Sequence, residues 1–336
     1  MADLSVNYMG LHLKNPIIVG SSVLTQSIDD LQTLEQSGVG AVVMKSVFEE
    51  QIYLDYDYLI QNVIADNLSQ LQHFETSDYT EKSIRREYLS SCEQNIREAK
   101  KRLSIPVIAS INCISASGWT SFASRLQDAG ADAIELNIAV QPFSSVLSAA
   151  DIEQLHIEII HKVVNSVSIP VAVKLSPFFS DLSRMIDDVA ATGVNGIVLF
   201  NRFIGPDIDI KNMQVMIAAN KYSSSSELPN TLRWIAMKSG DVPCDLGAST
   251  GIHTGADVIK ILLAGGAATH IVSTVLSNGT AQVALMLKDI ETWMDEKGFD
   301  RISRFAGTMN SLETNTPASY ERMQFMKYYA QNGTVE

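Results

Sequence analysis

Short apolar segments recur along the chain, and most end in a small, polar or charged residue. They are PIIVGSS (Pro16–Ser22), AVVMKS (Ala41–Ser46), PVIASI (Pro106–Ile111), AIELNI (Ala133–Ile138), PVAVKL (Pro170–Leu175), GIVLFN (Gly196–Asn201), VPCDLGAST (Val242–Thr250) and ATHIVST (Ala268–Thr274). Strands of a parallel sheet are buried on both faces and therefore read as apolar runs. Successive segments lie about 25 residues or more apart, which leaves room for a helical crossover. The pattern predicts a (β/α)8 TIM barrel.

One further element is predicted before the barrel. Leu4–Tyr8 and Leu11–Leu13 alternate around Met9 and Gly10, which predicts a β-hairpin before the first barrel strand. Such a hairpin is expected to plug the amino-terminal end of the pore. We expect one domain over residues 1–336, because a barrel of this kind often reaches that length.

Three intervals between strands are longer than a βα unit requires. They follow Ser46, Ile138 and Asn201, at the ends of predicted strands 2, 4 and 6. Loops after barrel strands lie on the catalytic face, so these insertions are expected to build a substrate pocket or lid. The short run Ser223–Ser226 in the last insertion is read equally as a mobile loop or as a disordered linker.

Composition narrows the class of protein. Hydrophobic residues make up 46% of the chain, and 25 Lys and Arg against 38 Asp and Glu leave a formal charge of −13. This balance argues against a nucleic-acid surface or an anionic membrane partner. Cys92, Cys113 and Cys244 share no metal-ligand spacing, so no metal site is expected. No signal peptide or membrane span is recognisable, and the expected location is the cytoplasm.

Four polar side chains break the apolar pattern where strands end. They are Lys45, Asn137, Lys174 and Asn201, and they are expected to converge on one face of the barrel. The flanking residues should point Lys174 into the barrel mouth, where an unpaired charge is costly. It is open to three roles: an ion pair with Glu135, a Schiff base, or support of a flavin.

The loops after the last two predicted strands are rich in small residues. They contain Ser249–Gly251 and Val272–Thr274. Such residues let backbone N–H groups approach a phosphate beside a helix N-terminus. Tight turns without a ligand are the alternative reading.

Several of these stretches together resemble the class 1 dihydroorotate dehydrogenase family. They are LKNPIIVGSS, VMKS, PVAVKLSPFF, the asparagine ending predicted strand 6, and STGIHTGADVIKILLAGGAATHIVST. The resemblance covers nearly the whole chain and implies an FMN-dependent barrel that oxidises dihydroorotate to orotate in pyrimidine biosynthesis. It also implies a homodimer. The electron acceptor or partner subunit leaves no sign in the sequence.

The resemblance assigns roles to individual residues. It implies that cofactor contacts come from Gly20, Ser21, Lys45, Ser46, Asn137, Lys174, Asn201, Thr250, Gly251, Ser273 and Thr274. It implies that the substrate is bound by Lys45, Asn137, Asn201 and Arg202. Thr250 and Gly251 stand where the family has two glycines, and Ser273 stands where it has threonine.

The substrate half departs from the family pattern. Where the family has Asn-Leu-Ser-Cys-Pro-Asn, this chain has Val140 at the position of the cysteine base and Pro142 at that of the second asparagine. Valine cannot accept a proton. Ser144 and Ser145 are therefore candidate catalytic residues beside Lys45. Cys113 and His253 are the other replacements considered.

Three further functions remain compatible with these residues. The first is an FMN barrel dehydrogenase for another small substrate, and the second is a non-catalytic FMN-binding protein. The third is a Schiff-base lyase that uses Lys174 on a phosphorylated substrate. A flavoprotein is yellow and a lyase is colourless, so the visible spectrum separates them.

Overall fold

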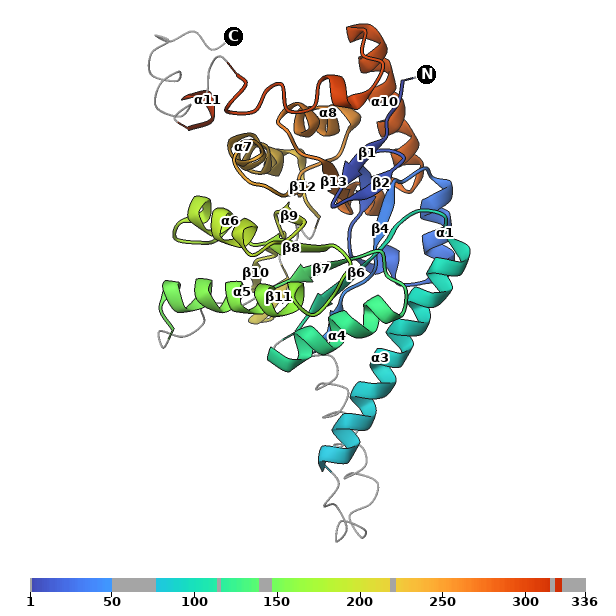
Figure 1. Ribbon diagram of the computed structural model, residues 1–336, viewed down its shortest axis with the longest axis vertical. Coiled ribbons are helices and arrows are strands. Elements are labelled where there is room, and N and C mark those ends of the chain that lie inside the picture. The colour runs from blue at the N-terminus through green and yellow to red at the C-terminus, as the bar shows by residue number, and fades with distance from the viewer. Residues whose placement is uncertain are drawn as a thin grey trace.

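Eight parallel strands close into a barrel with helices around it (Figure 1), as the sequence predicts. The structure is a computed structural model that describes residues 2–49, 77–113, 116–138, 147–217, 222–314 and 318–321. The barrel strands are β3 (Ile17–Val19), β4 (Ala41–Val43), β6 (Val107–Asn112), β7 (Ala133–Asn137), β8 (Val171–Leu175), β9 (Gly196–Leu199), β12 (Asp245–Ser249) and β13 (Ala268–Ile271). Parallel pairing of Val42 with Val107 joins β4 to β6 and closes the ring.

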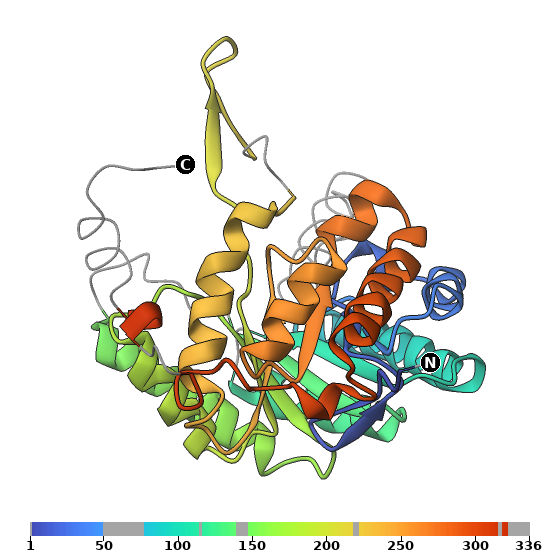
Figure 2. The same cartoon turned by 90° about the horizontal axis from the view of Figure 1, so that it is seen from above.

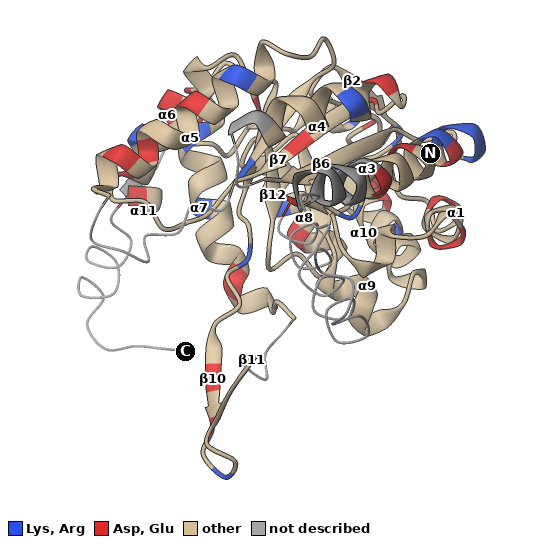
Figure 3. Cartoon of the chain, turned by 90° about the horizontal axis from the view of Figure 1, so that it is seen from below, with Lys and Arg blue, Asp and Glu red and all other residues tan. Residues whose placement is uncertain are grey.

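Helices follow the strands and cover the outside of the barrel. They are α1 (Ile28–Gln36), α3 (Ser77–Arg102), α4 (Ala116–Asp128), α5 (Ala149–Val164), α6 (Leu182–Ala191), α7 (Leu228–Lys238), α8 (Gly255–Leu263), α9 (Ser273–Asn278), α10 (Ala281–Lys297) and α11 (Ala318–Glu321). None of the described helices is long and apolar enough to cross a membrane. On the face shown in Figure 3, acidic and basic residues are distributed over these helices and do not gather in one basic patch.

Alternation along the strands divides the core into two layers. Residues such as Val42 and Val173 face the helices, whereas Val43 and Ala172 face the barrel interior. The predicted hairpin is present as β1 (Val6–Tyr8) and β2 (Leu11–Leu13), paired antiparallel. Its Tyr8, together with Met9 and Leu13, packs against the interior residues and fills the pore. The functional cavity therefore lies toward the other end of the barrel.

The three predicted insertions follow β4, β7 and β9. After β4 come β5 (Val47–Phe48), which pairs with β6, and the long helix α3. After β9 the chain forms an antiparallel hairpin of β10 (Pro206–Asp209) and β11 (Gln214–Ile217), which projects away from the barrel (Figure 2).

The run Ser223–Ser226 is only partly a loop: Ser223 and Ser224 form a loop held by hydrogen bonds, and the last two residues begin a 3-10 helix. It leads into the 3-10 helix η3 (Ser225–Glu227), directly before α7. The Ser224 N–H donates to the Glu227 carboxylate at 2.9 Å, and the Ser223 N–H donates to Ser273 Oγ at 3.0 Å. Hydrogen bonds to neighbouring elements hold this polar run in place, and composition alone does not reveal them.

Candidate active site

A cavity of about 330 Å³ opens at the carboxyl ends of β3, β8, β9, β12 and β13. Residues from all five strand ends line it, among them Ser21, Lys174, Asn201, Arg202, Thr250, Gly251, His270 and Ser273. Its volume falls in the range of about 300–1,000 Å³ that small-molecule sites occupy. Strands far apart in the sequence thus bring six of the predicted cofactor residues to one cavity.

Lys174 is the buried cation of this cavity. It lies on β8 between Val173 and Leu175, which face the helices, so alternation turns it inward. Its residue exposure is only 9%, and within the described residues its ammonium group forms no hydrogen bond and no ion pair within 4.0 Å. An ammonium group with so little exposure and no hydrogen bond or close ion pair is costly. The site therefore favours an anionic or electron-rich ligand at this position.

The loop after β12 holds its backbone in an unusual conformation. Thr250 and Gly251 both have φ of +82°, a region that β-branched residues rarely adopt. The Thr250 hydroxyl donates to the Phe200 carbonyl at 3.1 Å. A Cβ on Gly251 would lie 2.3 Å from the backbone nitrogen of Leu228, the first residue of α7. Glycine is therefore required here, and both Thr250 and Gly251 line the cavity.

Two hydroxyl residues follow β13 and have different surroundings. Ser273 lines the cavity, and its Oγ accepts a hydrogen bond from the Ser223 N–H. Thr274 is fully buried, and its hydroxyl donates to the His253 carbonyl at 3.2 Å. The His253 ring lies 3.2 Å from Ser223 Oγ, measured from Nε2. His253 and Thr274 thus support the loops, while Ser273 faces the ligand space.

The two asparagines meet at the cavity edge. The Asn201 amide donates to Asn137 Oδ1 at 3.0 Å, which joins the ends of β7 and β9 across β8. Arg202, the next residue, donates to Glu227 at 3.0 Å. Gly20 precedes Ser21, and its N–H donates to the Ile271 carbonyl at 3.1 Å.

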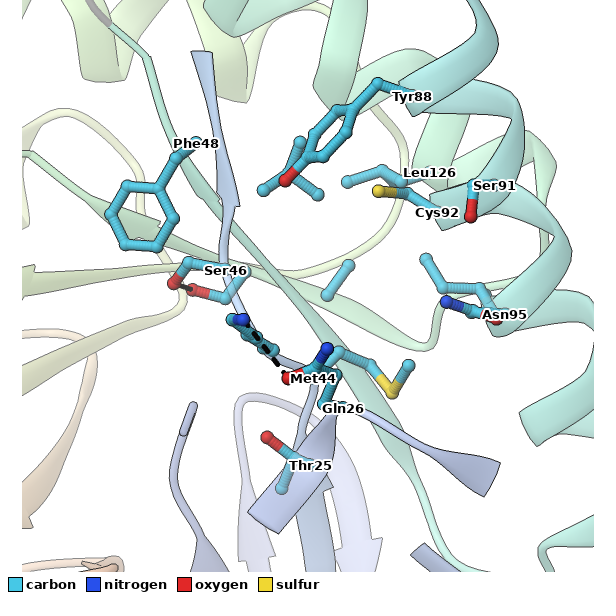
Figure 4. A pocket seen from close by; sticks show the side chains of 15 residues that line it. Thr25, Gln26, Met44, Ser46, Phe48, Tyr88, Ser91, Cys92, Asn95 and Leu126 are labelled. Carbon is cyan, nitrogen blue, oxygen red and sulfur yellow. Dashed lines mark hydrogen bonds between the residues drawn. The ribbon is translucent and has the colours of Figure 1, made fainter. Parts of the chain in front are cut away.

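Lys45 is not brought to this cavity. It is exposed, and its ammonium group donates to Gln26 Oε1 at 3.1 Å. It lines a second cavity of about 270 Å³ between the ends of β4 and β6 and helix α3 (Figure 4). Strict alternation after Val43 would turn Lys45 inward, but β4 ends at Val43. The buried side chain in this turn is instead that of Ser46, which contacts Ser21 and Ser110.

The candidate bases are placed only in part. Ser144 and Ser145, like Val140 and Pro142, lie outside the described residues. Cys113 is 5% exposed and belongs to the core between barrel and helices.

The interior histidine was missed by the sequence reasoning. His270 is 3% exposed and forms part of the cavity floor, and its Nδ1 lies 3.5 Å from Glu135 Oε2. A usable signal was present in ATHIVST, because Ala268 faces the barrel interior and period-two alternation places His270 on the same side.

Comparisons with known proteins agree with this geometry. Residues 83–294 match the family described as Dihydroorotate dehydrogenase. This range contains Asn137, Lys174, Asn201, Gly251 and Ser273. It does not contain the region of β3 and β4.

Individual relatives are distant but align over most of the chain. A protein of Thermoplasma acidophilum named dihydroorotate dehydrogenase B (NAD(+)), catalytic subunit, is 25% identical over 320 residues, covering 91% of this chain and 99% of the relative. A protein of Endomicrobium trichonymphae with the same name is 24% identical over 315 residues, covering 92% and 98%. The NAD-dependent dihydropyrimidine dehydrogenase subunit PreA of Escherichia coli K12 is 23% identical over 329 residues, covering 92% and 77%.

Proposed function

The chain belongs to the dihydroorotate dehydrogenase family, and we propose that it is an FMN-dependent oxidoreductase acting on a carbon–carbon single bond. The observation that carries the proposal is the Lys174 ammonium group, which forms no hydrogen bond and no ion pair within 4.0 Å among the described residues and faces the same cavity as the strained Thr250–Gly251 loop. One cavity is thus lined by a cation at one place and by a tight glycine-containing loop at another. FMN suits this cavity, because its ring can lie near Lys174 and its terminal phosphate near the Thr250–Gly251 loop.

The residues that would hold FMN fall into two groups. Around the phosphate we propose Thr250, Gly251, Ser273 and Thr274, of which Thr274 acts by fixing the loop. Around the ring we propose Gly20, Ser21, Lys45, Ser46, Asn137, Lys174 and Asn201, with Lys45 and Ser46 reached from the neighbouring cavity. When bound, FMN supplies the hydride acceptor. The cation of Lys174 is placed to favour negative charge at the ligand.

The substrate proposal is a dihydropyrimidine ring, with oxidation of dihydroorotate to orotate as its leading case. The relatives from Thermoplasma acidophilum and Escherichia coli are named for dihydroorotate and dihydropyrimidine respectively. Lys45, Asn137, Asn201 and Arg202 would bind the substrate. Val140 cannot accept a proton, so we propose that Ser144 or Ser145 acts as a weak substitute base and that oxidation of dihydroorotate is slow. Another small cyclic or carboxylated substrate is the alternative.

Electrons are proposed to leave through a partner subunit. The three relatives are named as subunits, two of them as catalytic subunits.

The projecting hairpin of β10 and β11 supports a protein contact, because Ile210, Met213 and Val215 are between 78% and 88% exposed (Figure 2). We propose that the chain is a cytoplasmic homodimer and that this hairpin contacts the second copy.

Cofactor binding is the test of this function. Purified protein, or protein incubated with FMN, is expected to show a flavin spectrum and to release FMN on denaturation. FAD is the matched control ligand, and the closed loop at Gly251 is expected to exclude its adenylated tail. A protein that stays colourless after incubation with FMN would contradict the proposal and favour the lyase. Anaerobic reduction with a panel of dihydropyrimidines then separates an enzyme from a non-catalytic flavin-binding protein.

A further inference from the structure

Three ionisable side chains share the barrel interior beneath the cavity. Glu135 on β7, Lys174 on β8 and His270 on β13 have exposures of 1%, 9% and 3%. Below them the interior positions are alanines and the apolar hairpin, so this layer is the polar floor of the site. Glu135 Oε2 lies 3.5 Å from His270 Nδ1. Groups of this kind are rarely buried without a function.

Polar atoms in this layer have unused hydrogen-bonding capacity. Among the described residues, Glu135 Oε1, both ring nitrogens of His270 and the Tyr8 hydroxyl are buried without a hydrogen-bond partner. The absence of a side chain at Gly247 makes room for them: a Cβ there would lie 2.7 Å from the Tyr8 hydroxyl and 3.2 Å from His270 Nε2. An unsatisfied buried polar group is destabilising, because it has lost its hydrogen bonds to water. The layer is therefore suited to accept a proton or a water molecule.

The charges around Glu135 determine which group accepts a proton. Burial raises the pKa of Glu135, and the nearby Lys174 ammonium opposes that rise. Burial, together with Lys174, lowers the pKa of His270 to about 3, so the imidazole is neutral near pH 7. Burial raises the pKa of Tyr8 above its usual range, so its hydroxyl also stays neutral.

Among the described residues, the other titratable groups that face this layer come from the end of β12 near the hairpin. Burial raises the pKa of Asp245, although its carboxylate accepts the Met9 N–H at 2.7 Å. Burial raises the pKa of the neighbouring Cys244 to about 11. Lys174 is therefore the positive charge that acts on Glu135. A negative charge that offsets Lys174 would raise the pKa of Glu135 further, and the carboxylate would take up a proton.

A chain of hydroxyl groups leads toward Glu135. Ser21 Oγ lies 3.0 Å from Ser46 Oγ, which lies 2.7 Å from Ser110 Oγ. Ser110 is directly opposite Glu135 in the β6–β7 register. Ser21 lines the first cavity, whereas Ser46 and Ser110 line the second, where Figure 4 labels Ser46. The hydroxyl chain thus runs from the second cavity to Ser110, the residue opposite Glu135 on the neighbouring strand.

We propose that Glu135, supported by His270, is a buried proton acceptor that takes up one proton when negative charge forms in the cavity beside Lys174. The proposal rests on the proposed function only for the source of that charge, which is reduction of the cofactor. The proton enters from water in the second cavity. Each of the Ser46 and Ser110 hydroxyls gains one proton and gives one up, so only Glu135 changes its state. The protonated carboxyl can then donate to Nδ1 of neutral His270.

The first arm of the test needs no cofactor. Lys174→Met removes the positive charge, which acts on Glu135 as added negative charge would. The infrared spectrum of Lys174→Met near pH 7 is expected to contain a protonated-carboxyl band that wild type and the double variant Lys174→Met/Glu135→Gln lack. If Lys174→Met shows no such band, the proposal is overturned. His270→Leu in the Lys174→Met background removes the Nδ1 acceptor and is expected to shift the band; an unshifted band would overturn the role of His270.

The second arm uses the flavin-loaded protein. The slope of the midpoint potential against pH is expected to be about twice as steep in wild type as in Glu135→Gln, because wild type takes up one more proton per two electrons. Equal slopes in a yellow protein would overturn the inference and leave the proposed function intact. A protein that binds no flavin would contradict the proposed function, and the infrared arm would still decide the inference.

Two further variants locate the effect. His156→Gln alters another buried histidine, on α5 outside the barrel, whose Nδ1 lies 2.7 Å from the Ile152 carbonyl. It is expected to keep the wild-type slope, and a halved slope in this variant would show that the effect is not specific to Glu135. Ser46→Ala is expected to take up the same number of protons as wild type but several-fold more slowly. An unchanged rate of uptake would overturn the hydroxyl route.

Discussion

The two halves of the barrel's carboxyl face differ in what builds them. Around β8, β9, β12 and β13 the site is made by backbone shape and one inward cation, Lys174, and the loop at Gly251 packs against α7. Around β4 and β7 the family pattern depends on particular side chains. There Lys45 faces the second cavity, and Val140 stands at the position of the family's base. On the proposed function, cofactor binding is expected to tolerate substitution that proton transfer does not.

The largest effect is expected in the substrate half, at Val140, which stands at the position of the family's cysteine base. A positioned general base contributes about 10²- to 10⁴-fold to rate. Val140→Cys is therefore expected to accelerate reduction of the bound flavin by dihydroorotate by up to that factor. The measurement is the anaerobic rate of flavin bleaching. Val140→Ser is the weaker matched variant, and Ser144→Ala and Ser145→Ala test whether either serine already acts. If Val140→Cys leaves the rate unchanged, the divergence at this position does not limit the reaction.

The next effect tests the packed loop of the cofactor half. In Gly251→Ala the new methyl group would lie 2.3 Å from the backbone of Leu228, in a left-handed conformation that disfavours alanine. Overpacking and the positive φ together are expected to lower the free energy of unfolding by roughly 2–4 kcal/mol and to weaken FMN binding. Denaturant unfolding and flavin titration measure both quantities.

Thr250→Gly is the matched control in the same loop. It relieves a β-branched residue at φ +82° but loses the hydrogen bond to Phe200. These terms oppose each other at about 1 kcal/mol each, so stability and FMN affinity are expected to change little. Equal losses of stability and FMN affinity in both variants would show that the loop tolerates no change. The clash with the backbone of Leu228 would then not explain the effect of Gly251→Ala.

The smallest effect concerns the cation. Lys174→Met keeps the length of the side chain and removes its charge. Loss of a charged contact of about 1.5–3 kcal/mol is expected to weaken FMN binding roughly 10- to 100-fold and to lower the midpoint potential. Fluorescence titration and a redox titration measure these quantities. Lys45→Met, in the second cavity, is the control. A larger loss of FMN affinity in Lys45→Met than in Lys174→Met would show that the second cavity, and not the first, provides the main cation for FMN.

Much of the fold could be predicted from the sequence because local pattern determines it. The apolar run PVAVKLS makes β8 and turns Lys174 inward by alternation alone. The turn at Met9 and Gly10 predicts the plugging hairpin. The protruding hairpin of β10 and β11 has no such signature, because its apolar residues remain exposed and form no core pattern.

The site was less predictable because it depends on where strands end and which strands meet. Lys45 leaves the ring because β4 stops at Val43, one residue before the apolar run ends at Met44. The Glu135–His270 contact joins β7 and β13, which are distant in sequence and not adjacent in the ring. Only the closed barrel brings them together.

The most direct test of the central difference between the halves is the reductive half-reaction of wild type. Protein loaded with FMN is mixed anaerobically with dihydroorotate or with dithionite, and flavin absorbance is followed in time. We predict rapid bleaching by dithionite, which needs no base. Bleaching by dihydroorotate is expected to be slower, by about 10²-fold or more, than it would be with a positioned general base. Bleaching by dihydroorotate at an ordinary enzymatic rate of about 1–10³ s⁻¹ would show that the substrate half is intact and would contradict this account.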